Sequence, residues 1–217
     1  MPALKIKARF VEPMLLESTV RLPEGASWVY ELKLDGYRAE AIRSGGRVCL
    51  RSRNDKDFNI GYPTLVQALA AMPDETVVDG EIVALDESGR PSFTALRNHG
   101  SAAAALVYYA FDVMVLAGKD VMSEPLNVRR ELLREHVLSK VSEPIRESLE
   151  LAANLPDLVR QSARSRRVGG QTERQPLRAR SALGRVAKYA HQSRTTAGDR
   201  GIHALWQDVR CDCVRLL

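Results

Sequence analysis

Short runs of aliphatic and aromatic residues, partly alternating with polar residues, follow one another through the first part of the chain. Runs of this length and alternation predict β-strands. The predicted strands span residues 28–34, 37–43, 47–53, 76–86 and 106–116. The dipeptides Asp35-Gly36 and Gly45-Gly46 separate the first three strands and predict tight turns between them.

Apolar residues at helical spacing lie between and after these strands. The predicted helices span residues 62–72, 92–98 and 128–138, and a further helix begins over 155–161. Pro63 lies in the first turn of the first helix, and Pro73 ends that helix. Strands that mostly follow one another, with helices between them, predict an α+β domain with antiparallel sheets.

The pattern changes after about Gln161. Residues 162–217 show neither helical nor strand periodicity, hold few large aliphatic residues and are rich in arginine. Residues 161–217 hold 12 of the 32 Lys and Arg but four of the 27 Asp and Glu, a net charge of +8, which leaves −3 for residues 1–160. The sequence therefore predicts a domain over 1–161 and a basic, irregular and disordered tail over 162–217.

Length and composition exclude several classes of protein. A chain of 217 residues with 45% hydrophobic residues can form a core. No apolar run reaches membrane-spanning length, and the N-terminus lacks a signal-peptide pattern. Cys49, Cys211 and Cys213 are too few and too unevenly spaced for a disulfide framework or a four-ligand zinc site. We expect a monomeric cytoplasmic protein without a membrane partner.

The candidate chemistry lies in the segment E-L-K-L-D-G-Y-R, residues 31–38. Lys33 precedes the expected turn, and Arg38 lies on the following strand. A buried lysine near cationic groups can lose its proton near neutral pH and become a nucleophile. The alternative is a solvated lysine beside an ordinary hairpin. The pattern K-x-D-G-x-R resembles the nucleophile motif of the covalent nucleotidyltransferases, which include ATP-dependent DNA ligases, RNA ligases and mRNA capping enzymes.

Further segments resemble the other motifs of this family, in the same order. With K-x-D-G-x-R they make four matches, and the matching residues are Arg53 in R-S-R-N, Glu81 in V-V-D-G-E-I-V and Phe111 in Y-Y-A-F-D-V-M. Glu31, two residues before Lys33, matches the family residue that reads the adenine amino group. Each of the three residues in the further segments has a structural alternative: an exposed strand end for Arg53, a hairpin with outward-facing acids for Glu81, and core packing for Phe111. Four matches in order and at plausible spacing favour the family. Over residues 10–161 the chain most resembles bacterial ligases of the end-joining type, ligase D and its stand-alone relatives.

This resemblance implies an ATP-grasp-like nucleotidyltransferase domain, here incomplete, which uses ATP and Mg²⁺ or Mn²⁺. Lys33 would form a lysyl-AMP intermediate, with Asp35 fixing the turn that aims it. The substrate would be nicked double-stranded DNA in repair and recombination at the bacterial nucleoid, with end-joining repair proteins as partners. The resemblance assigns the remaining residues as follows: Glu31 reads the adenine amino group, Arg38 and Arg53 hold sugar and phosphate, Glu81 contacts the ribose and the metal, and Phe111 stacks on the base.

Residues 162–217 lack the family's later elements: an E-G-x-x-x-K motif, a lysine-bearing strand after a tryptophan, and an oligonucleotide-binding barrel. A reading of the same codons one base out of phase permits Q-G-L-E-G-L-V-A-K-R from Ala163, in which Arg166 to Gln171 become the E-G-x-x-x-K motif. Codon degeneracy alone explains a few such residues but not three family motifs in order. We therefore expect the tail to be out of frame, although the expected lysine after the tryptophan reads as asparagine or serine.

Two functional hypotheses follow. The first is an ATP-dependent DNA ligase whose activity is impaired or absent, because the later lysines and the second metal-site glutamate are missing. The alternative is a non-catalytic fragment that binds nucleic acid through its basic tail, with an affinity that falls steeply with salt. A guanylyltransferase-type relative is disfavoured by the spacing of the ligase-like motifs.

Overall fold

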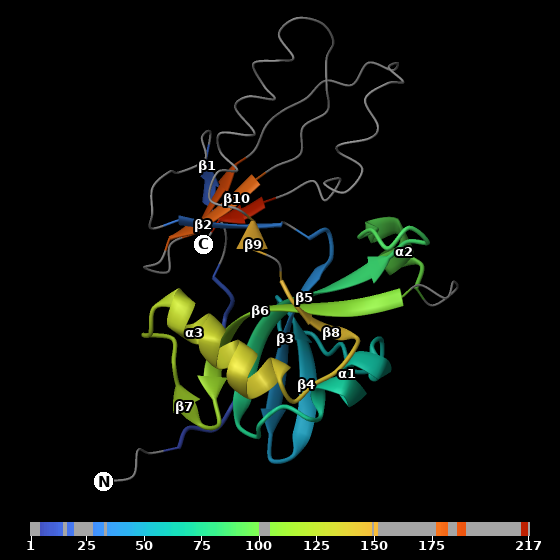
Figure 1. The fold of residues 1–217 in the computed structure, drawn as a ribbon. Coiled ribbons are helices and arrows are strands. Elements are labelled where there is room, and N and C mark those ends of the chain that lie inside the picture. Colours follow the sequence, from blue (N-terminus) through green and yellow to red (C-terminus); the bar gives the residue numbers. More distant parts are fainter. Residues whose placement is uncertain are drawn as a thin grey trace, which may run out of the picture. The chain divides into compact units, whose positions relative to one another are not determined.

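The computed structural model describes residues 5–14, 17–19, 28–32, 34–99, 105–148, 150–151, 177–181, 186–189 and 214–216 (Figure 1). The chain divides into two units. The first unit consists of residues 1–13 and 35–148, and the second consists of residues 14–34 and 149–217. Within the described residues, no helix is long and apolar enough to cross a membrane.

A six-stranded sheet forms the centre of the first unit, with the strand order β4-β3-β5-β6-β7 and with β8 beside β6. Its strands are β3 (Tyr37–Ser44), β4 (Arg47–Ser52), β5 (Thr76–Leu85), β6 (Ala105–Leu116), β7 (Lys119–Asp120) and β8 (Ile145–Glu147). All neighbours pair antiparallel except β8, which pairs parallel with β6. Gly45 and Gly46, with positive φ of 58° and 77°, form the predicted turn between β3 and β4.

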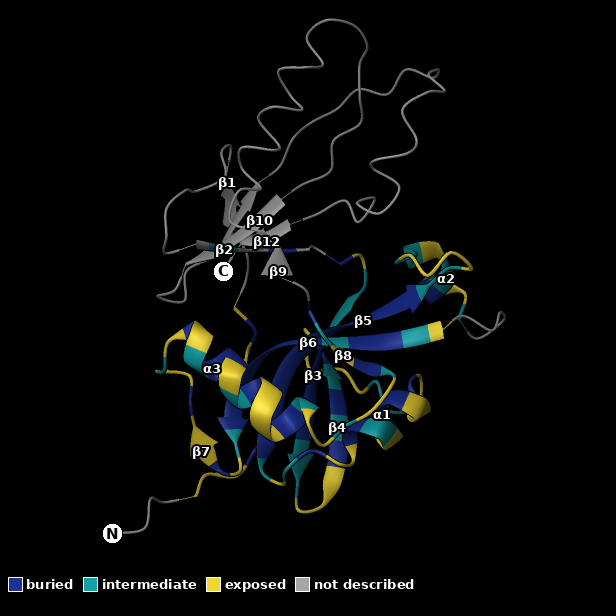
Figure 2. Ribbon diagram, in the orientation of Figure 1, coloured by how far each residue is buried: buried dark blue, intermediate teal, exposed yellow. Residues whose placement is uncertain are grey.

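Helices cover this sheet and complete its larger core (Figure 2). They are α1 (Pro63–Leu69), α2 (Phe93–Arg97), α3 (Leu126–Leu133) and the π-helix η1 (Arg134–Leu138), which continues α3. Ser92 caps α2, since its hydroxyl accepts a hydrogen bond from the Ala95 backbone N–H at 3.2 Å. The helical members of the core cluster are Leu65, Leu69, Leu96, Leu133 and Val137, and all are almost fully buried.

A smaller core cluster consists of Ala8, Ile42, Val77, Met114 and Val115. Successive residues of a strand point to opposite faces, so Ile42 lies on the other face of β3 from its neighbour Ala41 in the larger core. The N-terminal segment, residues 5–13, packs against this cluster. It is attached by backbone N–H groups, with Ile6 donating to the Gly118 carbonyl at 2.8 Å and Ala8 donating to the Glu75 carboxylate at 2.6 Å.

The second unit contains a six-stranded sheet with the order β1-β11-β10-β12-β2-β9. Its strands are β1 (Glu17–Thr19), β2 (Trp28–Leu32), β9 (Glu150–Leu151), β10 (Leu177–Ser181), β11 (Val186–Tyr189) and β12 (Val214–Leu216). The sequence pattern did not predict the three strands β10, β11 and β12 in the tail. Strand pairing uses backbone groups that every residue except proline supplies, so it does not require alternating side chains. The helix predicted to begin over 155–161 lies outside the described residues.

The predicted strands and helices of the first unit are confirmed, but one turn prediction needs correction. Asp35-Gly36 does not close a hairpin, because β2 pairs with β9, β10 and β12 whereas β3 pairs with β4 and β5. Asp79-Gly80 lies in the middle of β5, as the predicted strand over 76–86 requires. The hairpin alternative for Glu81 is therefore wrong.

Candidate functional site

Gly36 lies directly against the backbone of β5. A Cβ atom at this position would lie 2.2 Å from the Ile82 carbonyl oxygen, so only glycine fits without a backbone shift. The Gly36 backbone N–H also donates a hydrogen bond to the Glu81 carboxylate at 3.0 Å. These two contacts fix the D-G part of the K-x-D-G-x-R motif beside Glu81.

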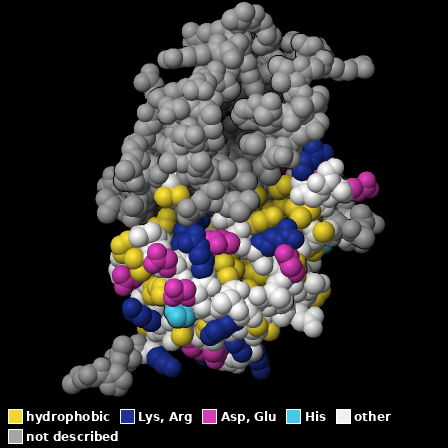
Figure 3. Space-filling model, viewed as in Figure 1, with side chains coloured by type: hydrophobic (Ala, Val, Ile, Leu, Met, Phe, Trp, Pro, Cys, Tyr) yellow, Lys and Arg dark blue, Asp and Glu magenta, His cyan; other side chains and the backbone are white. Residues whose placement is uncertain are grey.

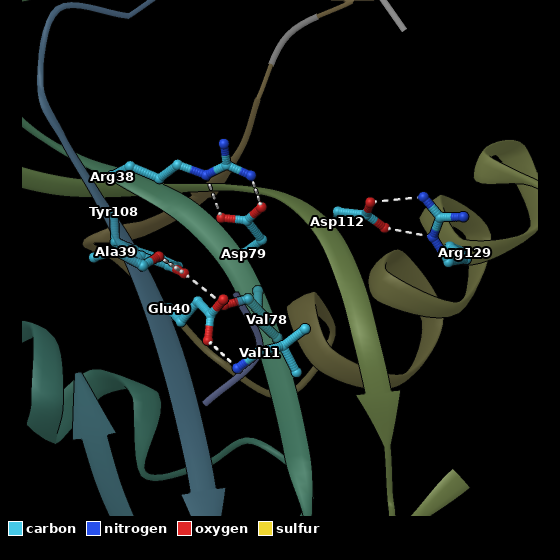
Figure 4. A network of polar contacts seen from close by, with 9 residues as sticks. All are labelled: Val11, Arg38, Ala39, Glu40, Val78, Asp79, Tyr108, Asp112 and Arg129. Atoms are coloured by element: carbon cyan, nitrogen blue, oxygen red, sulfur yellow. Dashed lines mark hydrogen bonds and ion pairs between the residues drawn. The ribbon is translucent and has the colours of Figure 1, made fainter. Parts of the chain in front are cut away.

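Arg38 forms a buried ion pair with Asp79 of the adjacent strand (Figure 4). Its Nε and Nη2 donate to the two carboxylate oxygens at 3.0 and 2.5 Å, a bidentate geometry that fixes the guanidinium plane. Burial alone would lower the pKa of Arg38, but the charge and hydrogen bonds of Asp79, with the charge of Glu81, raise it above its usual value. Glu81 is the register partner of Arg38 in β5, so the predicted residues Arg38 and Glu81 are neighbours.

Phe111 lies at an irregularity in β6. Gly80 pairs with Ala110 and Asp79 pairs with Asp112, so Phe111 is the extra residue of a β-bulge. The ring is almost fully buried, and the Arg38 guanidinium lies over it with its carbon 5.6 Å from the ring centroid. This is a cation–π distance. The structure therefore brings Arg38, Glu81 and Phe111 together on β3, β5 and β6.

Tyr108 explains why β5 has glycine at position 80. A Cβ atom on Gly80 would lie 2.4 Å from the Tyr108 ring, which crosses the strand at this point. The buried Tyr108 hydroxyl lies 3.0 Å from both the Ala39 and the Val78 carbonyl oxygens, on β3 and β5. Tyr108 thus ties these strands together beside the Arg38–Asp79 pair, and burial raises its pKa well above the usual value.

Glu40 is a further buried carboxyl that the sequence reading missed. It is 1% exposed, and its Oε2 accepts a hydrogen bond from the Val11 backbone N–H at 3.0 Å (Figure 4). Burial, and to a smaller extent the charges of Asp79 and Asp55, raises its pKa from 4.5 to about 8, against the opposing effects of the Val11 hydrogen bond and of Arg38. At neutral pH most Glu40 carboxyls therefore carry a proton.

The remaining predicted site residues are Arg53 and Asp35 in the first unit, Glu31 in the second unit, and Lys33. Arg53 is exposed just after β4, and no hydrogen bond or ion pair joins it to the other described residues of the set. Asp35 is exposed beside Gly36. Glu31 is buried in β2 of the second unit, and Lys33 lies outside the described residues. The described residues contain no group of three or more potential metal-binding His, Cys, Asp or Glu side chains.

Comparison with known proteins decides the family. The family model described as the ATP dependent DNA ligase domain matches residues 10–162, well over half of the chain. The chain belongs to the ATP-dependent DNA ligase family. The resemblance read from the sequence motifs is confirmed.

The similar curated proteins are bacterial ligases. The multifunctional non-homologous end joining protein LigD of Pseudomonas aeruginosa is 37% identical over 147 residues, which are 66% of this chain and 18% of that protein. DNA ligase C1 of Mycolicibacterium smegmatis is 36% identical over 145 residues, 60% of this chain and 42% of that protein. The chain thus spans less than half the length of these ligase relatives.

Two solved structures share the fold. A mycobacterial DNA ligase D complexed with ATP and MES matches with a TM-score of 0.62 and 29% identity, over 82% of this chain and 60% of that one. The ligase domain of Mycobacterium tuberculosis LigD matches with a TM-score of 0.56 and 32% identity, over 69% and 50% respectively. The predicted α+β nucleotidyltransferase fold of the ligase is confirmed.

Proposed function

We propose that the active chemistry of this chain is transfer of AMP from ATP to Lys33, the first step of DNA ligation. The lysine Nζ attacks the α-phosphorus, an N–P bond forms, and the bond to the bridging oxygen breaks so that pyrophosphate leaves. The observation that supports the proposal most is the packing of Gly36 against Glu81 of β5. Gly36 lies between Lys33 and Arg38, so this contact fixes the nucleophile motif beside β5. Membership of the ligase family supports it independently.

Each predicted site residue has a role in this proposal. Phe111 stacks on the base, and Glu31 accepts a hydrogen bond from the adenine amino group. Arg53 is exposed and free to reach the sugar, whereas Arg38 contributes positive charge beside the base while paired with Asp79. Asp35 shapes the segment before Gly36. Phosphoryl transfer depends on positioning and charge neutralisation, so these contacts carry most of the catalysis.

Glu81 would hold a divalent cation, Mg²⁺ or Mn²⁺. Among the described residues it is the one carboxylate that the family resemblance assigns to a metal, and it lies beside the motif segment. Magnesium at nucleotide sites commonly uses one or two carboxylates and completes its shell with phosphates and water, so a single glutamate fits this metal. When bound, the ion neutralises charge on the phosphates.

In the whole ligase, the adenylate passes to a 5′-phosphate at a DNA nick, and the 3′-hydroxyl then displaces AMP and seals the strand. We propose nicked DNA as the substrate class, end-joining proteins as partners and the bacterial nucleoid as the place of action. The names of the LigD relatives support the end-joining assignment. We further propose that residues 162–217 are read out of frame. The family match ends at residue 162, where the composition changes, which supports this proposal.

The test is incubation of the chain with α-labelled ATP and Mg²⁺, followed by a denaturing gel. We expect a faint covalent band at most, because the phosphate-binding lysine of the E-G-x-x-x-K motif is absent from the sequence as given. The Lys33→Ala variant should lose that band, and Lys56→Ala, an exposed lysine outside the motifs, should keep it. A band that survives in Lys33→Ala contradicts the assignment of the nucleophile.

The second candidate function is binding of nucleic acid through the basic tail. Its support is the net charge of +8 on residues 161–217. In the view of Figure 3, by contrast, acidic and basic side chains are interspersed on the described part of the first unit. This second function is favoured if deletion of residues 162–217 abolishes binding to a DNA duplex and if the chain binds nicked and intact duplexes equally well.

A further inference from the structure

Two arginines of α3 are attached to the bulge that contains Phe111. Arg129 binds Asp112, the residue after Phe111, with Nε and Nη2 donating to the two carboxylate oxygens at 2.8 and 2.7 Å. Its third nitrogen, Nη1, donates to the Glu124 carbonyl oxygen at 2.7 Å. The next residue, Arg130, donates from Nε to the Phe111 carbonyl oxygen at 3.4 Å. The helix therefore contacts the bulge at two consecutive residues.

The attachment lies where the sheet ladder is interrupted. On one side of β6, the register with β5 shifts at Phe111, between the pairs Asp79–Asp112 and Gly80–Ala110. On the other side, the pairing with β8 ends at Ala110, whose carbonyl oxygen accepts a hydrogen bond from the Ser148 N–H at 2.8 Å. The strand ladder is irregular at Phe111, and the contacts from α3 add to the constraints on this residue.

The Arg129–Asp112 pair is buried and geometrically demanding. The side chains are 10% and 6% exposed, compared with 45% and 30% for the pair of Arg134 and Glu147 at the start of η1. Breaking a buried pair leaves an uncompensated charge, whereas an exposed pair contributes little. A lysine keeps the charge but has no planar fork to bind both carboxylate oxygens, so Arg129→Lys alters the geometry selectively.

We propose that Arg129, acting through Asp112, and Arg130 are positioning residues that hold the Phe111 ring in its base-stacking orientation. The inference rests on the proposed function, in which Phe111 stacks on the adenine of ATP. The Asp79–Asp112 register pair places the two bidentate ion pairs, Arg38–Asp79 and Arg129–Asp112, beside each other around the bulge (Figure 4). Helix α3 thereby controls the affinity for the base without touching the nucleotide.

The first test measures the position of Phe111 without any nucleotide. The full chain has four phenylalanines, so labelling with 4-fluorophenylalanine gives four ¹⁹F resonances, and Phe111→Leu identifies the one of interest. Arg129→Lys should shift this resonance and leave those of Phe58 and Phe93 in place, and the control Arg134→Lys should shift none. If Arg129→Lys does not fold, the nearly isosteric Asp112→Asn carries the test. An unmoved Phe111 resonance in a folded variant overturns the proposal.

The second test separates recognition of the base from recognition of the phosphates. Arg129→Lys should weaken ATP binding about fivefold and leave tripolyphosphate binding unchanged, because stacking on one aromatic side chain contributes about 1–3 kcal/mol per base. In the Phe111→Leu background, Arg129→Lys should cause no further loss of ATP affinity. The positioning role is contradicted if Arg129→Lys weakens the binding of ATP and of tripolyphosphate equally, or if the losses of ATP affinity from Arg129→Lys and Phe111→Leu are additive. If the wild-type chain binds no ATP, the proposed function fails, while the ¹⁹F measurement still decides the positioning claim.

Discussion

Replacement of Glu40 by glutamine tests whether the buried carboxyl under the N-terminal segment is protonated at neutral pH. The burial that raises its pKa to about 8 means that the folded chain holds this proton between about pH 4.5 and 8, whereas the unfolded chain releases it. Stability therefore falls as pH rises wherever the native state binds more protons. The stability that the bound proton of Glu40 contributes is present in full below pH 4.5, declines between pH 4.5 and 8, and is lost above pH 8.

The magnitude follows from the shift. A difference of one pKa unit corresponds to about 1.4 kcal/mol, so the carboxyl costs the folded chain about 3 kcal/mol by pH 7 and about 5 kcal/mol above pH 9 relative to acid conditions. Glutamine cannot ionise, and its amide oxygen still accepts from the Val11 N–H. The stability of Glu40→Gln relative to wild type should therefore increase by these amounts as the pH is raised.

The assay is urea unfolding of both chains at pH 5, 7 and 9, followed by far-UV circular dichroism. The difference between the two unfolding free energies isolates the titration of Glu40 and the groups coupled to it, namely Asp79, Asp55 and Arg38. The control is Glu12→Gln, which removes an exposed carboxylate next to Val11. It measures how the loss of one negative charge, without burial, changes the unfolding free energy. A difference between wild type and Glu40→Gln that stays constant from pH 5 to 9 would show that Glu40 does not change protonation on folding in this range.

Two further substitutions test the packing of the site. Gly36→Ala should destabilise the first unit by about 1–3 kcal/mol and weaken ATP binding, because the new Cβ meets the Ile82 carbonyl at 2.2 Å. Its control, Gly61→Ala, meets nothing closer than 3.7 Å, and equal effects of the two changes in urea unfolding would contradict the contact. Tyr108→Phe should cost about 1–2 kcal/mol in the same assay, because it removes a buried hydroxyl that bridges β3 and β5. An unchanged unfolding midpoint would show that the hydroxyl contributes nothing.

Hydrophobic patterning was sufficient for the longer strands and the helices of the first unit, but not for the short strands β7 and β8 or for the pairing of the strands. The strands around Tyr37 and Arg47, and the helices beginning at Pro63 and Leu126, follow directly from runs and spacings that the physics of burial imposes. A glycine dipeptide, however, looks the same whether it closes a hairpin, as at Gly45-Gly46, or lets two strands approach closely, as at Gly80. Pairing is a tertiary property, so local turn chemistry could not reveal it.

Sequence motifs drew attention to some residues of the candidate site, but they could not reveal residues whose role depends on burial. Glu81 and Phe111 were identified from their motifs, and the structure places them beside Arg38. No sequence motif marks Glu40, Arg129 or Arg130. All three are at least 90% buried, and only the neighbouring elements determine that. The roles assigned to all the predicted site residues remain predictions: Glu31, Lys33, Asp35, Arg38, Arg53, Glu81 and Phe111.

The most direct test of the account compares the chain as it stands with a version whose reading frame is restored after codon 161. Both are incubated with labelled ATP and Mg²⁺, and the labelled peptide is identified by mass spectrometry. The restored chain should carry AMP on Lys33 at a far higher level than the original chain, and Lys33→Ala should abolish the label in both. Absence of label from the restored chain, or label on another residue, contradicts the central claim that Lys33 is the nucleophile of a DNA ligase.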